Sequence, residues 1–281
     1  MKKITLRAKA KINLTLDVLG VKDGYHIINS LVTTVGLFDT ITITARKDDR
    51  ITLKNTGLDV GCSVVDNNAY KSARLFQKHT GCNGVDILID KKIPVGGGLG
   101  GSSADIAGVL NGMKALYCPD MDVMPLANEL GSDSGYMTVG GVAVISGRGE
   151  VVKPLALEIG LPVLIICGDK GISARECYRA YDAMNESSSA CTDDAVKSFM
   201  DGDSDKFFSS LKNDLYKPAL EFVPEMAGAI ADLKKVGAVT ALMTGSGSAV
   251  YGLFENARKA SSAYKKLFEI YGDKVIKTKT I

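Results

Sequence analysis

The sequence predicts an α+β protein in two domains, and three patterns along the chain lead to this fold class. Threonine and isoleucine alternate over residues 40–44, which is typical of an antiparallel strand with one solvated face. Residues 85–117 have the pattern of a strand, a glycine-rich turn and a long helix. Residues 161–279 follow the order β-α-α-β-β-α-β. Both halves of the chain therefore combine strands with helices.

Composition limits the classes of function. The chain has 281 residues, of which 46% are hydrophobic and 23% charged, with a net charge of +2. These values are ordinary for a globular protein and do not point to nucleic-acid or membrane binding. No apolar run approaches the ~20 residues of a membrane span, and the basic N-terminus lacks a signal-peptide core. We therefore expect a cytoplasmic protein. The alternation of apolar and polar residues loosens around residues 147–160, so we expect domains at residues 1–153 and 154–281.

Cysteine and histidine usage argues against a metal site. No two cysteines have the C-x-x-C spacing of a zinc or redox site, and only His26 and His79 are present. Free thiols in a reducing compartment are the expected state of the cysteines. These are Cys62, Cys82, Cys118, Cys167, Cys177 and Cys191.

The first 66 residues read mainly as strands. Residues 2–19 alternate as a strand that places Lys11 and Asn13 on one face. Such a lysine is most often solvated, and the alternative is a cation that reaches a phosphate or a hydroxyl. Residues 22–26 form a turn from which Tyr25 and His26 emerge, either as surface residues or as a platform for a ring. Successive strands are expected over residues 30–53.

Two helices and a strand surround a glycine-rich turn. Residues 67–79 are expected to be helical with Asn67 as the cap, and residues 85–89 alternate as a strand. Five glycines follow between residues 96 and 101, and Ser102 and Ser103 stand where a helix N-cap is expected. Glycine backbone can approach a ligand closely, and the first N–H groups of a helix attract anions. The turn is therefore predicted to bind phosphate.

The type of phosphate loop can be narrowed by its context. A P-loop requires Lys and then Ser or Thr after its second glycine, and Gly101 is followed by two serines. The spacing of Gly96, Gly98 and Gly101 fits a dinucleotide fingerprint formally. That fingerprint continues into a second parallel strand, whereas residues 118–131 read as a turn and another helix. A dinucleotide-dependent oxidoreductase is therefore disfavoured.

A short acidic turn follows the glycine-rich segment. Residues 124–131 predict a helix ending at Gly131, and strands are expected over residues 136–146. Asp133 lies between them in the sequence Ser-Asp-Ser-Gly. An aspartate in such a turn usually bonds to its own backbone, and the alternative is a general base near the phosphate loop.

The C-terminal half begins with a strand at residues 161–167 and a helix from Ser173. Residues 184–206 are polar and acidic, and are expected to be helical with exposed loops. The remaining elements are a helix at 223–235, a strand–glycine turn–strand unit at 238–254, a helix at 256–271 and a strand at 274–279. The turn at residues 243–247 is either a second anion-contacting turn or a plain hairpin.

Three separated segments together resemble the GHMP small-molecule kinase superfamily. They are residues 10–13 (AKIN), residues 94–104 (PVGGGLGGSSA) and residues 244–247 (TGSG). The resemblance implies an N-terminal half like domain 2 of ribosomal protein S5 and a ferredoxin-like C-terminal half. It also implies an ATP:alcohol phosphotransferase, with Mg²⁺ arriving with the nucleotide. The DGYH sequence after AKIN, with Asp105 after the loop, suits members whose acceptor is a cytidine-diphosphate-linked polyol.

The resemblance also implies roles for individual residues. Lys11 and Asp133 match the catalytic lysine and aspartate. Tyr25 and His26, with Tyr178 as a second aromatic, would hold the cytosine ring. Substrate-binding positions also include Asn13, which would line the polyol pocket, and Gly245. The ATP-binding positions are Asn67 near the nucleoside, and Pro94, Val95, Gly96, Gly97, Gly98, Leu99, Gly100, Gly101, Ser102, Ser103 and Ala104 around the phosphates.

One segment departs from the superfamily pattern. The catalytic aspartate is usually followed by a hydrophobic residue, a proline and an aromatic residue, whereas Asp133 is followed by Ser134, Gly135 and Tyr136. Without the proline, the turn that aims the carboxylate is less constrained. Two alternatives therefore remain. The protein is a relative that phosphorylates another alcohol, of the mevalonate or sugar type, or it is a non-catalytic nucleotide-binding relative. The expected assembly is a monomer or a homodimer, with no nucleic-acid partner.

Overall fold

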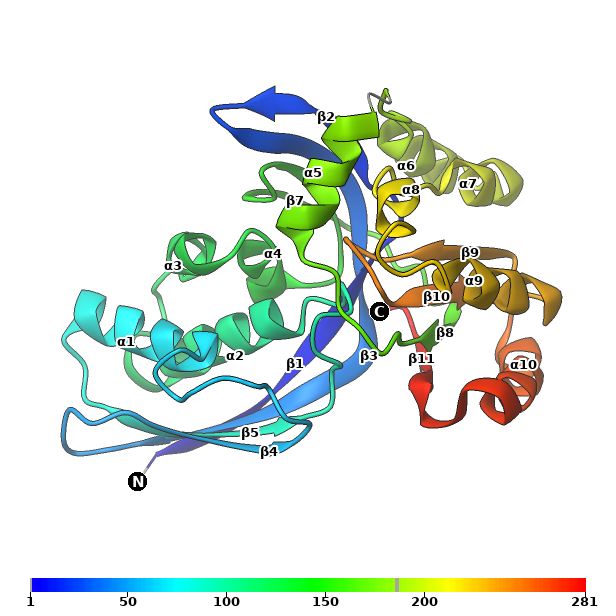
Figure 1. The fold of residues 1–281 in the computed structure, drawn as a ribbon. Coiled ribbons are helices and arrows are strands. Elements are labelled where there is room, and N and C mark those ends of the chain that lie inside the picture. Colours follow the sequence, from blue (N-terminus) through cyan, green and yellow to red (C-terminus); the bar gives the residue numbers. More distant parts are fainter. Residues whose placement is uncertain (1, 185–186) are drawn as a thin grey trace. The chain divides into compact units, whose positions relative to one another are not determined.

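The longest element is β3 (Tyr25–Ala45), a strand of 21 residues that contributes to two separate units of the chain (Figure 1). The computed structural model describes residues 2–184 and 187–281. The first unit comprises residues 1–10, 37–95 and 100–140, and the second comprises residues 11–36, 96–99 and 141–281. Neither unit is contiguous in sequence, since β1 (Lys3–Asn13) and β3 each cross from one unit into the other. The domain boundary expected after residue 153 stays a prediction.

The first unit is a sheet covered by helices. The end of β3 pairs antiparallel with β5 (Val85–Lys91), which pairs in parallel with β4 (Thr52–Gly57). The helices lie together on one side of these strands (Figure 1). They are α1 (Asn68–Thr80), α2 (Gly101–Tyr117), α3 (Met124–Leu130) and α4 (Ser134–Val139).

Two glycines bring α2 close to this sheet. Cβ atoms added to Gly108 and Gly112 would lie 2.6 Å from Ile41 Cδ1 and 2.4 Å from Ile43 Cδ1. Ile41 and Ile43 are fully buried. The two glycines therefore let the middle of α2 pack directly on these isoleucines.

The second unit contains the start of β3 and a separate four-stranded sheet. β3 pairs antiparallel with β2 (Asp17–Lys22) and β6 (Val142–Gly147), and β6 pairs with β7 (Val151–Leu155). The other sheet has the order β11-β8-β10-β9. Its strands are β8 (Pro162–Ile166), β9 (Thr240–Met243), β10 (Val250–Leu253) and β11 (Val275–Lys279).

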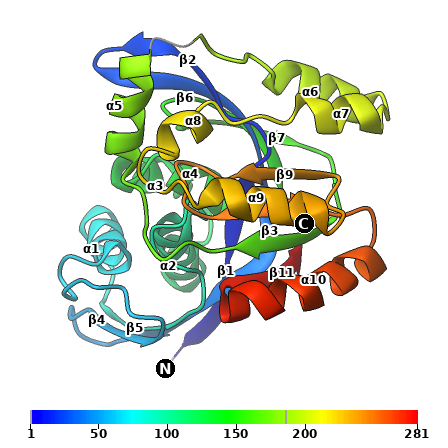
Figure 2. The same cartoon turned by 45° about the vertical axis from the view of Figure 1, so that its right-hand side comes forward.

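Helices cover this second sheet. α9 (Met226–Lys235) and α10 (Ala257–Tyr271) pack on one of its faces (Figure 2). Leu164, Leu233 and Leu267 are fully buried in the core between these helices and the strands. The remaining elements are α5 (Ala174–Met184), α6 (Thr192–Met200), α7 (Ser204–Ser210), α8 (Tyr216–Ala219) and a short 3₁₀ turn (Gly272–Lys274).

The structure corrects four expectations about the elements. Successive strands were expected over residues 30–53, whereas β3 runs without interruption to Ala45. The expected strand over residues 136–139 is the helix α4, and Gly140 and Gly141, with φ of 69° and 73°, separate it from β6. Ser102 and Ser103 lie inside α2, whose N-cap is Gly100 with φ of 70°. The loosened pattern over residues 147–160 contains β7.

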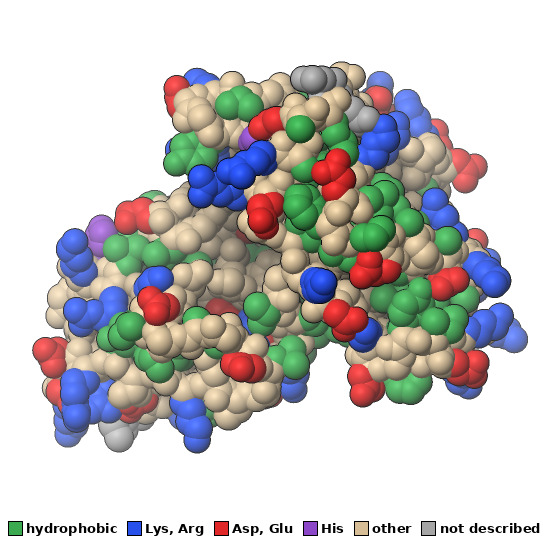
Figure 3. All heavy atoms as spheres, viewed as in Figure 1, with side chains coloured by type: hydrophobic (Ala, Val, Ile, Leu, Met, Phe, Trp, Pro, Cys, Tyr) green, Lys and Arg blue, Asp and Glu red, His purple; other side chains and the backbone are tan. Residues whose placement is uncertain are grey.

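Three local expectations are confirmed, at Asn67, at Gly131 and at the cysteines. Asn67 caps α1 by accepting from Ala69 N, and α3 ends at Gly131. All six cysteines are free thiols. Positive and negative side chains are intermixed on the face that Figure 3 shows. Across the described residues, no helix has both the length and the apolar character needed to cross a membrane.

Candidate active site

Lys11 and Asn13 share a face at the end of β1, as the strand pattern predicts. That face is buried, since the two residues are only 3% and 2% exposed. Lys11 Nζ donates to Asn13 Oδ1 at 2.5 Å, and Asn13 Nδ2 donates to Ser30 Oγ at 2.8 Å. Burying an ammonium group is costly unless it has charged or polar partners, so this lysine is not the ordinary solvated lysine of a strand.

The glycine run of the second unit lies against the same strand end. Lys11 N donates to Leu99 O at 3.0 Å, and Thr244 Oγ1 donates to Gly98 O at 3.2 Å. Gly98 has φ of 75°, and an added Cβ would lie 2.2 Å from Thr244 O. Any larger residue would collide with backbone there, which explains the glycine.

The turn after β9 completes this convergence. Asn13 N donates to Thr244 Oγ1 at 3.1 Å. A Cβ added to Gly245 would lie 3.1 Å from Gly98 O and 3.4 Å from Lys11 Nζ. Residues 11–13, 96–99 and 244–247 are thus neighbours in space within the second unit. The segments 11–13 and 96–99 and the turn at 244–247 therefore form one cluster, and the anion-contacting role of the turn stays a prediction.

Asn213 and Tyr251 support this cluster, although the sequence analysis did not predict them as site residues. Asn213 Nδ2 donates to Met243 O at 3.0 Å and to Gly245 O at 2.9 Å, which holds the turn in place. The hydroxyl of Tyr251, a fully buried residue, donates to Asn13 O at 2.9 Å. The pattern around each residue fits an ordinary core position, so only the folded chain reveals these contacts.

The start of α2 and the loop of Asp133 are neighbours in the first unit. A Cβ added to Gly131 would lie 2.9 Å from Ser134 Oγ and 3.7 Å from Ser103 Oγ. Asp133 stands at the N-cap position of α4, but its carboxylate does not cap that helix. The general-base role of Asp133 and its alternative, a turn bonded to its own backbone, both stay predictions.

The other residues expected around ATP are divided between the two units. Ser102 Oγ accepts from Asn68 Nδ2 at 2.9 Å. Asn67 uses its side chain to cap α1, through a bond of 2.9 Å to Ala69 N. Pro94, Val95, Gly100, Gly101, Ser103 and Ala104 also belong to the first unit, whereas Gly96, Gly97, Gly98 and Leu99 belong to the other.

A group of rings lies beside the β2–β3 turn in the second unit. The rings of His26 and Tyr178 are stacked, with centroids 4.5 Å apart and an interplanar angle of 22°. His26 Nε2 is 2.7 Å from Asp182 Oδ1, within hydrogen-bonding distance. The guanidinium group of Arg148 lies over the ring of Tyr25 at 4.5 Å. Tyr25 itself is 56% exposed, so its ring is accessible to a ligand.

Asp182 and Arg148 are further residues that sequence reasoning missed. Tyr178 and Asp182 are four residues apart on α5 and therefore share a helix face, a spacing that could have indicated Asp182. No comparable pattern points to Arg148, which follows β6 at the turn toward β7.

Comparison with known proteins decides the family. The sequence profile of the GHMP kinases N terminal domain matches residues 67–148, and that of the GHMP kinases C terminal domain matches residues 195–273. The chain belongs to the GHMP kinase family. This result confirms the expected family and its mixed fold of strands and helices in two parts.

Individual GHMP kinases support the assignment over nearly the whole chain. A 4-diphosphocytidyl-2-C-methyl-D-erythritol kinase from Alkaliphilus metalliredigens is 33% identical, with 96% of this chain and 94% of that protein covered. A protein of the same name from Cutibacterium acnes is 34% identical, with coverage of 95% and 92%.

Solved structures of GHMP kinases agree with this result. A crystal structure of 4-(cytidine 5'-diphospho)-2C-methyl-D-erythritol kinase is 30% identical, with a TM-score of 0.84 and 99% of each chain covered. Homoserine kinase from Cytophaga hutchinsonii has a TM-score of 0.76 at 16% identity, with 100% of this chain and 95% of that chain covered, and it shows the shared fold alone.

Proposed function

We propose that this GHMP kinase transfers the γ-phosphoryl group of ATP to the 2-hydroxyl of 4-diphosphocytidyl-2-C-methyl-D-erythritol, a step in isoprenoid precursor synthesis. The observation that carries the proposal is the buried cluster of Lys11 and Asn13 with the glycine run and the turn at Gly245. The names of the relatives favour this acceptor over mevalonate-type or sugar alcohols.

The backbone would supply most of the phosphate binding. Phosphoryl transfer depends mainly on positioning and on stabilising negative charge, and not on covalent chemistry of the protein. The first N–H groups of α2, at Gly101, Ser102 and Ser103, have no acceptor within the helix and would donate to the phosphates. The glycines between residues 96 and 100 would let the rest of the loop approach the nucleotide closely.

Magnesium would be held chiefly by the nucleotide. Among the described residues, no group of three His, Cys, Asp or Glu side chains could hold a metal ion. Mg²⁺ usually binds through a few protein oxygens, several waters and the substrate phosphates, so such a cluster is not required. The ion would neutralise charge on the β- and γ-phosphates.

Two side chains would act on the acceptor alcohol. Asp133 would accept the proton of the hydroxyl, and Lys11 would stabilise the charge that develops on the transferred group. Asn13 would line the polyol pocket. Tyr25, with His26 and Tyr178, would bind the cytosine ring by stacking and hydrogen bonding.

The direct test is a coupled assay of ADP release with a panel of acceptors. We expect turnover with 4-diphosphocytidyl-2-C-methyl-D-erythritol and none with mevalonate, homoserine or sugars. Phosphorylation of one of the other alcohols instead would overturn the proposed acceptor. ATP binding without transfer to any alcohol would favour a non-catalytic relative.

Substitution of the two proposed catalytic residues tests the mechanism. We expect Lys11→Met and Asp133→Asn to lower kcat by about 10²–10⁴-fold while ATP binding, measured by calorimetry, survives. Lys9→Met, two residues along the same strand, and Glu129→Gln, on the exposed face of α3, are the matched controls and should keep normal turnover. Normal turnover in both site variants would reject the assigned roles.

Location and assembly belong to the same proposal. We expect a cytoplasmic enzyme that is a monomer or a homodimer, and light scattering after size exclusion measures the assembly directly.

A further inference from the structure

A buried group of three charges lies directly beneath the first turn of α2. Lys91 Nζ donates to Asp39 Oδ2 at 2.5 Å and to Asp105 Oδ2 at 2.6 Å. The side chains of Lys91, Asp39 and Asp105 are only 3%, 0% and 8% exposed. A Cβ added to Gly101, the first residue of α2, would lie 3.2 Å from Lys91 Nζ. This charge triplet therefore joins β3 and β5 to the helix start that we assign to phosphate binding.

The two carboxylates of the triplet are bonded unequally. Asp39 accepts three hydrogen bonds, from Lys91 Nζ and from the backbone N–H groups of Lys92 at 2.5 Å and Ile93 at 2.8 Å. Asp105 accepts only from Lys91, and within the described residues its buried Oδ1 has no hydrogen-bond partner. Because three donors stabilise the anion of Asp39, a proton added to the triplet goes to Asp105.

The net charge of the triplet depends on that proton. With both carboxylates ionised the net charge is negative, and with Asp105 protonated it is zero. Burial raises the pKa of Asp105 to about 7, with repulsion from Asp39 adding to the rise and attraction to Lys91 opposing it. The free protein therefore has both protonation states within reach near neutral pH.

Neighbouring elements bring few other charges to this turn of α2. From α1, the uncharged amide of Asn68 donates a hydrogen bond to Ser102 Oγ. The α3–α4 loop, which approaches Ser103 through Gly131, carries Asp133 as its titratable residue. Asp39 and Lys91 are the charged groups that act on the pKa of Asp105.

We propose that Asp105 takes up a proton when the phosphates of ATP bind at the start of α2, so that nucleotide binding is coupled to protonation of a positioning residue. The inference rests on the proposed function. Asp105 lies four residues beyond Gly101, which is about one helical turn or ~6 Å from the phosphate-binding end. A phosphate with two negative charges within about 10 Å, at an effective dielectric constant of about 20, favours the neutral carboxyl more than tenfold.

The coupling has a definite sign. Below the pKa of about 7, Asp105 already carries its proton and ATP binds without a penalty. Above that pH the proton must come from solution, so ATP binding weakens as pH rises. We expect a loss of affinity of about tenfold between pH 6.5 and pH 8.5 in the wild-type protein.

The test is calorimetric titration of the whole protein with ATP at saturating Mg²⁺, in PIPES or HEPES and in Tris, whose ionisation enthalpies differ. We expect uptake of about half a proton or more per ATP at pH 7.5. Asp105→Asn keeps the size of the side chain and an acceptor for Lys91 but cannot titrate. This variant should bind ATP with no comparable uptake and with a flatter pH dependence.

A matched control variant tests whether the proton uptake is specific to Asp105, and the possible results test the coupling separately from the proposed function. Asp90→Asn, on β5 one residue before Lys91 and half-exposed, should leave the uptake unchanged. Wild-type binding without proton uptake, or uptake that persists in folded Asp105→Asn, overturns the coupling and leaves the kinase assignment standing. Absence of ATP binding overturns the proposed function itself. If Asp105→Asn does not fold, absence of proton uptake in the wild-type protein still overturns the coupling.

Discussion

Gly24 and Gly98 have nearly the same positive φ angle in different surroundings. Their φ angles are 77° and 75°, but a Cβ on Gly24 would meet nothing within 4 Å, whereas one on Gly98 would lie 2.2 Å from Thr244 O. We expect Gly24→Ala to destabilise the fold by about 1 kcal/mol, from backbone strain alone. Gly98→Ala should cost more and should also abolish ATP binding. Denaturant unfolding and calorimetry measure both effects, and equal costs would contradict the close approach.

The cysteines differ in the reactivity that their surroundings allow. Burial raises the pKa of Cys177 to about 12 and that of Cys191 to about 11, so neither forms much thiolate at pH 8. Cys62 is exposed. We expect a thiol reagent to label Cys62 within minutes in the native protein and to reach Cys177 and Cys191 only after unfolding. Mass spectrometry of the labelled peptides checks this, and rapid native labelling of Cys177 would contradict it.

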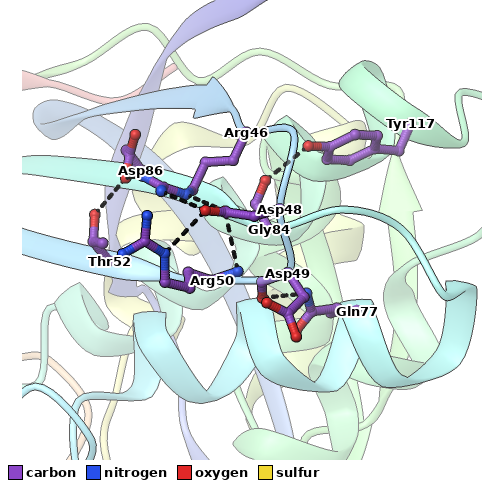
Figure 4. Close-up of polar contacts among 9 residues, drawn as sticks. All are labelled: Arg46, Asp48, Asp49, Arg50, Thr52, Gln77, Gly84, Asp86 and Tyr117. Atoms are coloured by element: carbon purple, nitrogen blue, oxygen red, sulfur yellow. Dashed lines mark hydrogen bonds and ion pairs between the residues drawn. The ribbon is translucent and has the colours of Figure 1, made fainter.

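At the scale of elements, one corner of the first unit is held by an ion-pair network (Figure 4). Arg46 donates from two nitrogens to Asp48, at 2.6 and 2.9 Å, and from Nη1 to Asp86 Oδ1 at 2.6 Å. Arg50 Nε also donates to Asp48, and Thr52 Oγ1 donates to Asp86. The network thus ties the loop after β3 to the first residues of β4 and β5.

Two helices are attached to the same corner. Gln77 Nε2 of α1 donates to Asp49 O at 2.7 Å, and Tyr117 OH of α2 donates to Gly84 O at 2.9 Å (Figure 4). Since Tyr117 is the last residue of α2, this corner holds the end of the helix opposite to the start that we propose binds phosphate.

The network predicts a pH-dependent contribution to stability. Hydrogen bonds from Arg46 lower the pKa of Asp48, and a bond from Thr52, with Arg46, lowers that of Asp86. Because these carboxylates have lower pKa values in the folded state, they stabilise the fold above pH ~4. This contribution is lost as they become protonated at lower pH. We expect Arg46→Gln to reduce the melting temperature at pH 7 and to make it fall less between pH 6 and pH 3.

A neighbouring arginine serves as the control for that prediction. The side chain of Arg50 is 72% exposed, against 19% for Arg46, so Arg50→Gln should have a much smaller effect. An Arg46→Gln variant that melts no lower than Arg50→Gln would contradict the predicted role of Arg46.

At the scale of the whole molecule, two ligands should stabilise the native state separately. A ligand at 100 times its dissociation constant adds about 2.7 kcal/mol to the free energy of unfolding. We expect ATP and cytidine diphosphate each to raise the melting temperature. Tyr25→Ala should abolish the shift from cytidine diphosphate and preserve that from ATP, because exposed Tyr25 contributes little to the core. Loss of both shifts would place the two ligands at one site.

Much of the fold follows from local patterns. Alternation in β1 and β5, the cap at Asn67 and the end of α3 at Gly131 depend on neighbouring residues only, so the sequence predicts them correctly. The predicted cap of α2 is wrong because two serines compete with Gly100, whose positive φ of 70° starts the helix at least two residues earlier. The prediction of a strand in place of helix α4 is wrong because the apolar residues of this segment suit a strand and a helix equally well.

The sequence by itself determined most strands and helices, the glycine-rich turn and the family resemblance, because these depend on residue spacing along the chain. Only the tertiary structure decided which distant residues meet. Asn13 and Thr244 are 231 positions apart, His26 and Asp182 are 156 apart, and Asp39 and Lys91 are 52 apart. Such pairs leave no periodic signal, since their contact depends on how strands and helices pack and on which charges that packing buries together.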